Sequence, residues 1–246
     1  MSKILTVHGL LGAGKDTSIS FIKAHMFLYK QYKNDLQIQS TYIEDMIREA
    51  ILEKDNHNWL CSELNIVIER FAKPLKTFIC GLLGCTEEEL NSQEFKSKQL
   101  NPEVFYSEKL GKVLTVRDLH TDVSDSLKET INLEIFATSC FERCKKHFSN
   151  GAEMVIINDL RYEDLELPLC NLNKSYLVKV TRVAAYDSNE KKSHSSEQGI
   201  PSDKFDTIIR NDSTYADLFK NILNMLVDAG IVTYSYKSYI EERLNQ

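Results

Sequence analysis

The chain has 246 residues, of which 42% are hydrophobic and 27% are charged, and its formal net charge is −6. This length is enough for one α/β domain with insertions, or for two small domains, and for a sizeable core. An acidic balance argues against a protein that holds polymeric nucleic acid on a broad basic surface, but it leaves room for local Arg and Lys clusters around a small anion.

Six cysteines occur without a C-x-x-C pair. Cys140 and Cys144 have a spacing that places both on one helix face, and no second pair with zinc-ligand spacing accompanies them. We expect thiols packed in a reducing compartment. A strand starts at once at the N-terminus and no apolar run reaches the length of a membrane span, so we expect a cytoplasmic protein without a membrane partner.

The first predicted elements are a strand over residues 4–8, the loop GLLGAGKDT at 9–17 and a helix over residues 15–29. The loop fits the phosphate-loop pattern G-x-x-x-x-G-K-[ST], except that Asp16 takes the hydroxyl position and Thr17 follows it. Its glycines permit a backbone whose N–H groups converge on an anion at the helix N-terminus. Lys15 adds a compact cation for the β- and γ-phosphates. The context favours a nucleotide phosphate site over an ordinary glycine-rich turn.

The elements that follow alternate between strands and helices. Further strands are predicted over residues 65–69, 154–158, 176–181 and 207–210, and further helices over residues 43–53, 74–83, 115–130, 133–148 and 214–228. The continuous apolar run MVII at 154–157 suits a sheet that is buried on both faces. This alternation after a phosphate loop predicts the α/β class, a three-layer α/β/α fold with a parallel central sheet.

Polar stretches interrupt this core. Residues 31–62 and 84–114 are expected as insertions on the substrate side, and residues 183–204 as a lid. Residues 229–246 are expected as an extension with an appended helix or an interface. The core of what we expect to be a single domain over residues 1–246 is then about 3–30, 63–83, 115–182 and 205–228.

Charged residues follow the predicted strands, where open α/β sheets bind ligands. Asp159 and Arg161 come after strand 154–158, where a carboxylate can position magnesium through water and an arginine can face phosphates. An Asp–Arg pair that fixes a turn explains them equally well. Arg182 follows strand 176–181, and Arg117 lies near the start of helix 115–130. Phosphoryl transfer requires positive charge, which such arginines would supply together with Lys15.

Other residues have a functional and a structural interpretation. Phe71 ends the second strand and either stacks on a base or fills the core, the commoner role of an isolated Phe. Asn211 lies in a segment that caps the last helix and could also touch an adenine ring. The cluster HSSE at 194–197 is explained equally well by capping.

With these residues in view, the chain resembles the phage-type deoxynucleoside monophosphate kinases. The resemblance rests on GKDT at 14–17, FAKPLK at 71–76, VR at 116–117, DLR at 159–161, KVTR at 179–182, HSSE at 194–197 and IRND at 209–212. These segments occur in the family's order across about residues 3–228. The aspartate after the phosphate-loop lysine is a feature of that family.

The resemblance implies a P-loop nucleoside monophosphate kinase fold that can form a homodimer. It implies ATP-dependent phosphorylation of a (deoxy)nucleoside monophosphate to the diphosphate, with magnesium, in the cytoplasm (the host's, if the protein is encoded by a phage) as a supply of DNA precursors. Transfer is then expected from Lys15, Arg117, Asp159, Arg161 and Arg182. ATP is expected at Gly12, Ala13, Gly14, Lys15, Asp16, Thr17 and Asn211, with magnesium at Asp16, Thr17 and Asp159. The nucleotide substrate is expected at Phe71, Lys76, Arg117 and Arg161.

The chain departs from the family in the region of the base and sugar pocket. A Leu-x-Gln-x-x-Gly-Thr-like stretch is replaced by DLHTDVSD at 118–125, and the position of a later tryptophan reads IFA at 135–137. The acidic residue expected four positions after Arg161 is Leu165, with Glu163, Asp164 and Glu166 nearby. Alternatives are therefore a kinase similar to dephospho-coenzyme A kinase or phosphomevalonate kinase, or a nucleotide-binding regulatory protein without catalysis.

Overall fold

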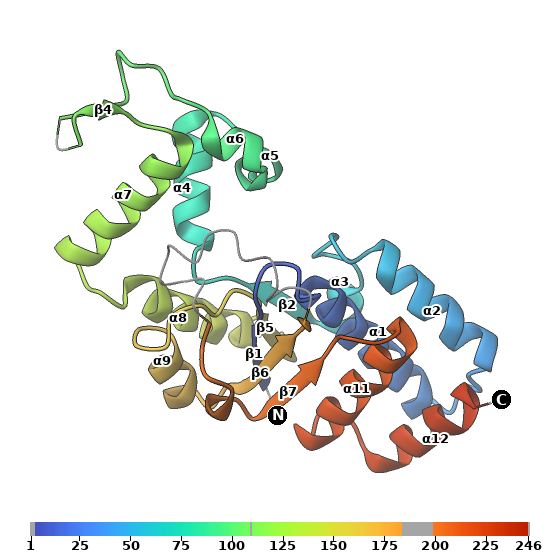
Figure 1. Ribbon diagram of the computed structural model, residues 1–246. Coiled ribbons are helices and arrows are strands. Elements are labelled where there is room, and N and C mark those ends of the chain that lie inside the picture. Colours follow the sequence, from blue (N-terminus) through green and yellow to red (C-terminus); the bar gives the residue numbers. More distant parts are fainter. Residues whose placement is uncertain (1–2, 109, 184–198, 246) are drawn as a thin grey trace. The chain divides into compact units, whose positions relative to one another are not determined.

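The structure is a computed structural model that describes residues 3–108, 110–183 and 199–245 (Figure 1). The chain divides into two compact units. The sheet unit contains the chain up to Glu69 and from Phe141 onward, and the helical unit is the segment Arg70–Cys140. Most of the expected lid, including the HSSE cluster at 194–197, lies outside the described residues.

The sheet unit is built on a five-stranded sheet with the order β2-β5-β1-β6-β7. Its strands are β1 (Lys3–His8), β2 (Ile66–Glu69), β5 (Met154–Ile157), β6 (Tyr176–Thr181) and β7 (Thr207–Arg210). Every neighbouring pair is parallel. The prediction of an α/β fold with a parallel central sheet is confirmed, and each predicted strand ends within a residue of its observed bounds.

Helices lie on both faces of the sheet (Figure 1). One face is covered by α1 (Lys15–Lys33), α2 (Ser40–Leu52), α11 (Tyr215–Asp228) and α12 (Tyr234–Leu244), whose apolar residues share a core with those of the strands. The other face carries the second half of α8 (Ile135–Ser149) and α9 (Leu167–Leu172). Two short helical turns complete the unit, α3 (Cys61–Leu64) and the 3-10 helix Ser202–Lys204. Alternation along β1 assigns Leu5 and Val7 to the α1 face, and each such fully buried side chain contributes about 1.5–3 kcal/mol to folding.

His25 of α1 is a buried polar residue within this core, with no exposed surface. Its ring stacks on Phe219 at a centroid distance of 3.7 Å, and its Nε2 donates to the Phe219 carbonyl oxygen over 2.9 Å. The hydroxyl of Tyr236 from α12 donates to the His25 carbonyl oxygen and lies 3.4 Å from Nδ1. Burial lowers the pKa of His25 to about 3, so the ring is neutral at neutral pH.

The helical unit comprises α4 (Lys73–Leu83), α5 (Glu87–Asn91), α6 (Gln93–Ser97), α7 (Val116–Thr130), the first turns of α8 and a short hairpin of β3 (Tyr106–Ser107) and β4 (Lys112–Val113). Its own core is Leu75, Ile79, Leu90, Leu114, Val116 and Leu119. Thr115 caps α7 through a capping box with Asp118. The N–H and O–H groups of Thr115, with Lys112, lower the pKa of Asp118 to about 2. The departure at 118–125 thus begins with a residue that stabilises a helix start.

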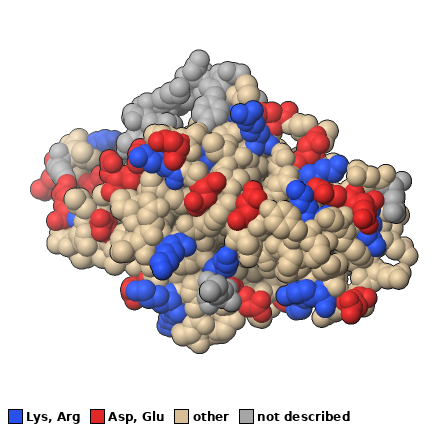
Figure 2. Space-filling model, turned by 90° about the horizontal axis from the view of Figure 1, so that it is seen from below, with Lys and Arg blue, Asp and Glu red and all other residues tan. Residues whose placement is uncertain are grey.

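Cys140, Cys144 and Cys170 are buried and are not joined in disulfides. None of the helices in the described ranges is long and apolar enough to span a membrane. On the face shown in Figure 2, Lys and Arg are interspersed with Asp and Glu among the residues drawn in colour.

Candidate functional site

The glycine-rich loop runs from the carboxyl end of β1 to the first residue of α1. Gly12 and Gly14 have φ of 81° and 90°, in the left-handed region that favours glycine. Gly14 is the N-cap of α1 and supplies no side-chain hydrogen bond to the first N–H groups of the helix. Those groups, together with the helix dipole, form an anion-binding end at which Lys15 is the first helical residue.

Two close approaches hold the loop against the sheet. A Cβ on Gly9 would lie 3.1 Å from the Val180 carbonyl oxygen of β6. Asn211, which follows β7, donates from Nδ2 to the Ala13 carbonyl oxygen over 2.9 Å, and a Cβ on Gly14 would lie only 2.1 Å from that Nδ2. Asn211 therefore supports the loop from the carboxyl end of β7, while its contact with adenine stays a prediction.

The segment after β5 carries Asp159, which is half-buried, and Arg161, which is exposed. The loop is held by the buried carboxyl group of Glu166, whose Oε2 accepts the backbone N–H groups of Arg161 (2.6 Å) and Tyr162 (3.1 Å). Burial, and then the nearby charge of Asp159, raise the pKa of Glu166 to about 8. Glu166 is the acidic residue that organises this loop, five positions after Arg161 rather than four.

His8, the last residue of β1, links three parts of this region. Its Nδ1 donates to the Leu160 carbonyl oxygen over 2.8 Å, and its Nε2 accepts the N–H of Ile200 over 3.5 Å. The ring also stacks on Phe205. Burial lowers the pKa of His8, and the charges of Lys179, Lys15 and Arg161 lower it further, so the ring is held neutral beside the phosphate loop.

Asn158 precedes Asp159 and is only 4% exposed. Its side-chain Oδ1 is buried without a hydrogen-bond partner, a property shared among the described residues only by Ser20 Oγ. Buried polar side-chain atoms are rarely left unpaired. This oxygen therefore marks a place at the carboxyl end of β5 where the protein alone does not satisfy a polar group.

The remaining predicted residues of the sheet unit lie at the same edge, because the carboxyl ends of parallel strands meet there. Asp16 and Thr17 are in the first turn of α1, with Thr17 nearly buried and Asp16 half-buried. Arg182 is exposed directly after β6. The described residues contain no group of three or more His, Cys, Asp or Glu side chains that could hold a metal. The side-chain oxygens at this edge are the carboxylates of Asp16 and Asp159, the hydroxyl of Thr17 and the unpaired Oδ1 of Asn158.

The predicted substrate residues lie in the helical unit, apart from Arg161. Arg117 is exposed at the start of α7, and its guanidinium donates to Gln93 Oε1 of α6 over 2.8 Å. Lys76 of α4 donates to Asn91 Oδ1 over 2.8 Å and lies 3.8 Å from Glu87. The neutral amide of Gln93 therefore orients Arg117 without cancelling its charge, whereas Lys76 is held by an amide and also by the carboxylate of Glu87.

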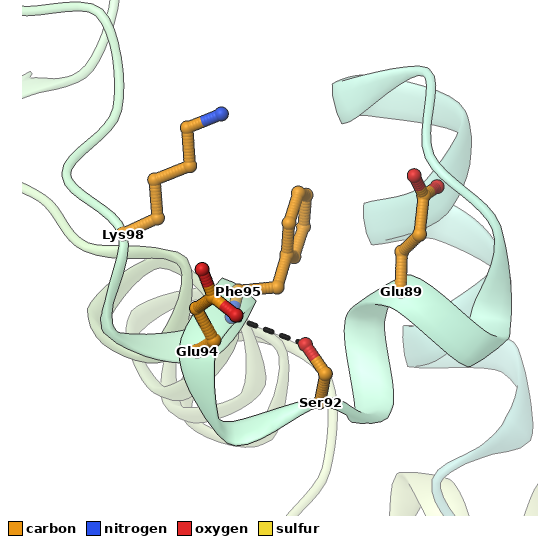
Figure 3. A pocket seen from close by; sticks show the side chains of 5 residues that line it. All are labelled: Glu89, Ser92, Glu94, Phe95 and Lys98. Carbon is orange, nitrogen blue, oxygen red and sulfur yellow. Dashed lines mark hydrogen bonds between the residues drawn. The ribbon is translucent and has the colours of Figure 1, made fainter.

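Phe71 is 1% exposed, so its ring fills a core position in this conformation and presents no face for stacking. Its contact with a substrate stays a prediction. A separate hollow of about 430 Å³ lies between α5 and α6 (Figure 3). It is lined by Glu89, Ser92, Glu94, Phe95 and Lys98, with the Phe95 ring between Lys98 and Glu89.

The sequence interpretation did not include Asn158, Glu166, His8 or Gln93 among the site residues. The sequence did contain a signal for Glu166, because the resemblance required an acidic residue close to its position. His8 and Asn158 had a weaker signal, since each is a polar residue at the end of an apolar strand. Gln93 had none, because its role depends on a partner 24 positions away.

A parallel sheet whose first strand runs into a glycine-rich loop and a helix, with helices on both faces, is the fold of a P-loop kinase. A sequence profile for deoxynucleotide monophosphate kinase matches residues 86–222, more than half of the chain. The chain belongs to the deoxynucleotide monophosphate kinase family. The matched range excludes the phosphate loop, so loop and match are independent observations. No curated protein matches the chain.

Proposed function

We propose that this protein transfers the γ-phosphoryl group of ATP to a deoxynucleoside monophosphate, forming the diphosphate as a DNA precursor. The observation that carries the proposal is the phosphate loop, whose helix end is open to an anion, in a member of this kinase family. Two cations, Arg117 held by a neutral amide and Lys76 held by an amide and by Glu87, support an anionic acceptor in the helical unit.

In this proposal the loop N–H groups and Lys15 bind the β- and γ-phosphates of ATP. Arg161 and Arg182 supply charge to the phosphoryl group as it leaves ATP, because transfer depends on positioning and on neutralising charge. Arg117 and Lys76 bind the phosphate of the acceptor. Glu166 and His8 hold the loop that carries Asp159 and Arg161.

Magnesium is part of the proposal, and the donor set fits it. Asp16, Thr17 and Asp159 offer carboxylate and hydroxyl oxygens, the hard ligands that Mg²⁺ prefers, and few of them are needed because the ion keeps several waters and binds phosphates. Bound there, the ion would neutralise phosphate charge. Asp16, Thr17 and Asp159 are the residues that would hold it.

The test is ADP formation from ATP and magnesium with each common deoxynucleoside and ribonucleoside monophosphate in turn. We expect turnover with at least one deoxynucleotide. Lys15→Ala should lower turnover by at least ~10²-fold, because a phosphate charge contact is lost. Lys33→Ala, at the other end of α1, is the matched control and should leave turnover unchanged. Intact ATP binding without turnover on any acceptor would instead indicate the regulatory protein, and turnover only on dephospho-coenzyme A or phosphomevalonate would indicate the other kinases.

A further inference from the structure

The unpaired amide oxygen of Asn158 is a feature of the site that the proposed roles of the other residues do not explain. The side chain is 4% exposed, and Oδ1 has no hydrogen-bond partner. A buried acceptor left unpaired lowers stability, and an apolar residue at this position would avoid that loss. A buried amide oxygen without a donor at a strand end is explained if a ligand donates the missing hydrogen bond.

Asn158 lies on the face of the sheet that carries the phosphate loop and α1. Its backbone N–H donates to the Glu69 carbonyl oxygen over 3.2 Å, so the β2–β5 ladder continues through this residue. Met154 and Ile156 belong to the core on the α1 face, and alternation along an extended strand assigns Asn158 to the same face. The phosphate loop leads into α1 on that face, and Asp159 is the next residue.

The chemistry of the expected ligands limits which groups could donate a hydrogen bond to Asn158 Oδ1. Phosphate oxygens accept hydrogen bonds and cannot satisfy an amide oxygen. Lys15 is the cation of the loop, but it is not a partner of Oδ1 in this structure. Beside a polyphosphate, the donors that a ligand adds to those of the protein are water molecules bound to its magnesium ion, which keeps most of its hydration shell in such sites.

We propose that Asn158 Oδ1 accepts a hydrogen bond from a magnesium-bound water, so that Asn158 is a positioning residue for the metal–nucleotide complex. The inference rests on the proposed binding of ATP with magnesium. It does not depend on which monophosphate accepts the phosphoryl group.

The experiment measures the dissociation constant of ADP by calorimetry, with excess magnesium and with EDTA, for the whole protein and three variants. The dissociation constant with EDTA divided by the constant with magnesium gives the factor by which the metal strengthens binding. Asn158→Ala removes the acceptor and should reduce this ratio roughly 3- to 10-fold while leaving the EDTA value unchanged. Asn158→Asp retains an acceptor and should keep the ratio at least at its original value. Ser20→Ala removes the other unpaired buried atom, at a distance in sequence from the strand end, and should change neither constant.

Circular dichroism verifies that each variant is folded. An unchanged ratio in Asn158→Ala overturns the inference, as does an equal loss with magnesium and with EDTA, which would assign the amide to the nucleotide itself. A folded Asn158→Asp that behaves like Asn158→Ala also overturns it. If the unsubstituted protein binds no ADP, the proposed function fails and the inference fails with it. If ADP binds but no monophosphate is phosphorylated, only the proposed acceptor reaction fails.

Discussion

Protonation of His25 should destabilise the sheet unit as the pH falls. The ring is fully buried, and burial lowers its pKa from 6.5 to about 3. A group whose pKa is lower in the folded than in the unfolded chain stabilises the fold at pH values above 6.5, and this stabilisation is lost as the pH falls towards the folded pKa. The direction is therefore acid destabilisation between pH 6.5 and about 3.

The magnitude follows from the difference between the two pKa values. At about pH 4.5, proton binding by the unfolded chain lowers the free energy of unfolding by about 3 kcal/mol relative to pH 7.5, and the full effect is about 5 kcal/mol. For a protein of this size, about 3 kcal/mol corresponds to a lowering of Tm by roughly 6–12 °C. The effect arises in the packing of α1 against α11 and α12.

The assay is urea unfolding at the two pH values, followed by the fluorescence of Trp59. This is the single tryptophan of the chain, and it lies in the sheet unit, where its indole donates to Glu49. His25→Gln is the control, because an amide can still donate to the Phe219 carbonyl oxygen but does not titrate. Other groups titrate in both proteins and cancel in the comparison. Equal losses of stability in the two proteins between pH 7.5 and pH 4.5 would refute the reasoning.

Two further predictions concern the site. Gly14→Ala should weaken ADP binding at least about tenfold, because its Cβ would clash with Asn211 at a φ of 90° that already costs about 1–2 kcal/mol. Gly151→Ala has the same backbone cost without a clash, and calorimetry should find its ADP affinity unchanged; equal affinities in all three proteins would contradict this account. Gln93→Glu should raise the KM for the monophosphate at least about fivefold, since the new carboxylate neutralises Arg117. Steady-state kinetics measure this, and an unchanged KM would remove Arg117 from phosphate binding.

The strands and long helices could be predicted because their signals are local. An apolar run such as residues 154–157, or a capping residue such as Thr115, determines its element within a few residues of itself. The short elements α5, α6, β3 and β4 have too few residues for a period to show, and the positions of α5 and α6 depend on packing against α4 and α7.

The contacts within the site could not be predicted, because they join residues that are far apart in the chain. His8 binds Leu160 across 152 positions, and Asn211 binds Ala13 across 198 positions. A sequence pattern identifies the loop and the strand ends, but not which amide faces which carbonyl. Phe71 illustrates the limit: the sequence allowed a stacking role or a core role, and only the fold shows that the ring is buried.

The helical unit is one uninterrupted stretch of chain, Arg70–Cys140, inserted between β2 and the second half of α8. The residues proposed to bind the acceptor phosphate, Lys76 and Arg117, lie within this stretch, and the phosphate loop lies outside it. A single exchange of this segment between related proteins would therefore transfer the acceptor contacts as one piece. Such a modular arrangement would allow acceptor choice to diverge within the family while the ATP-binding residues stay the same.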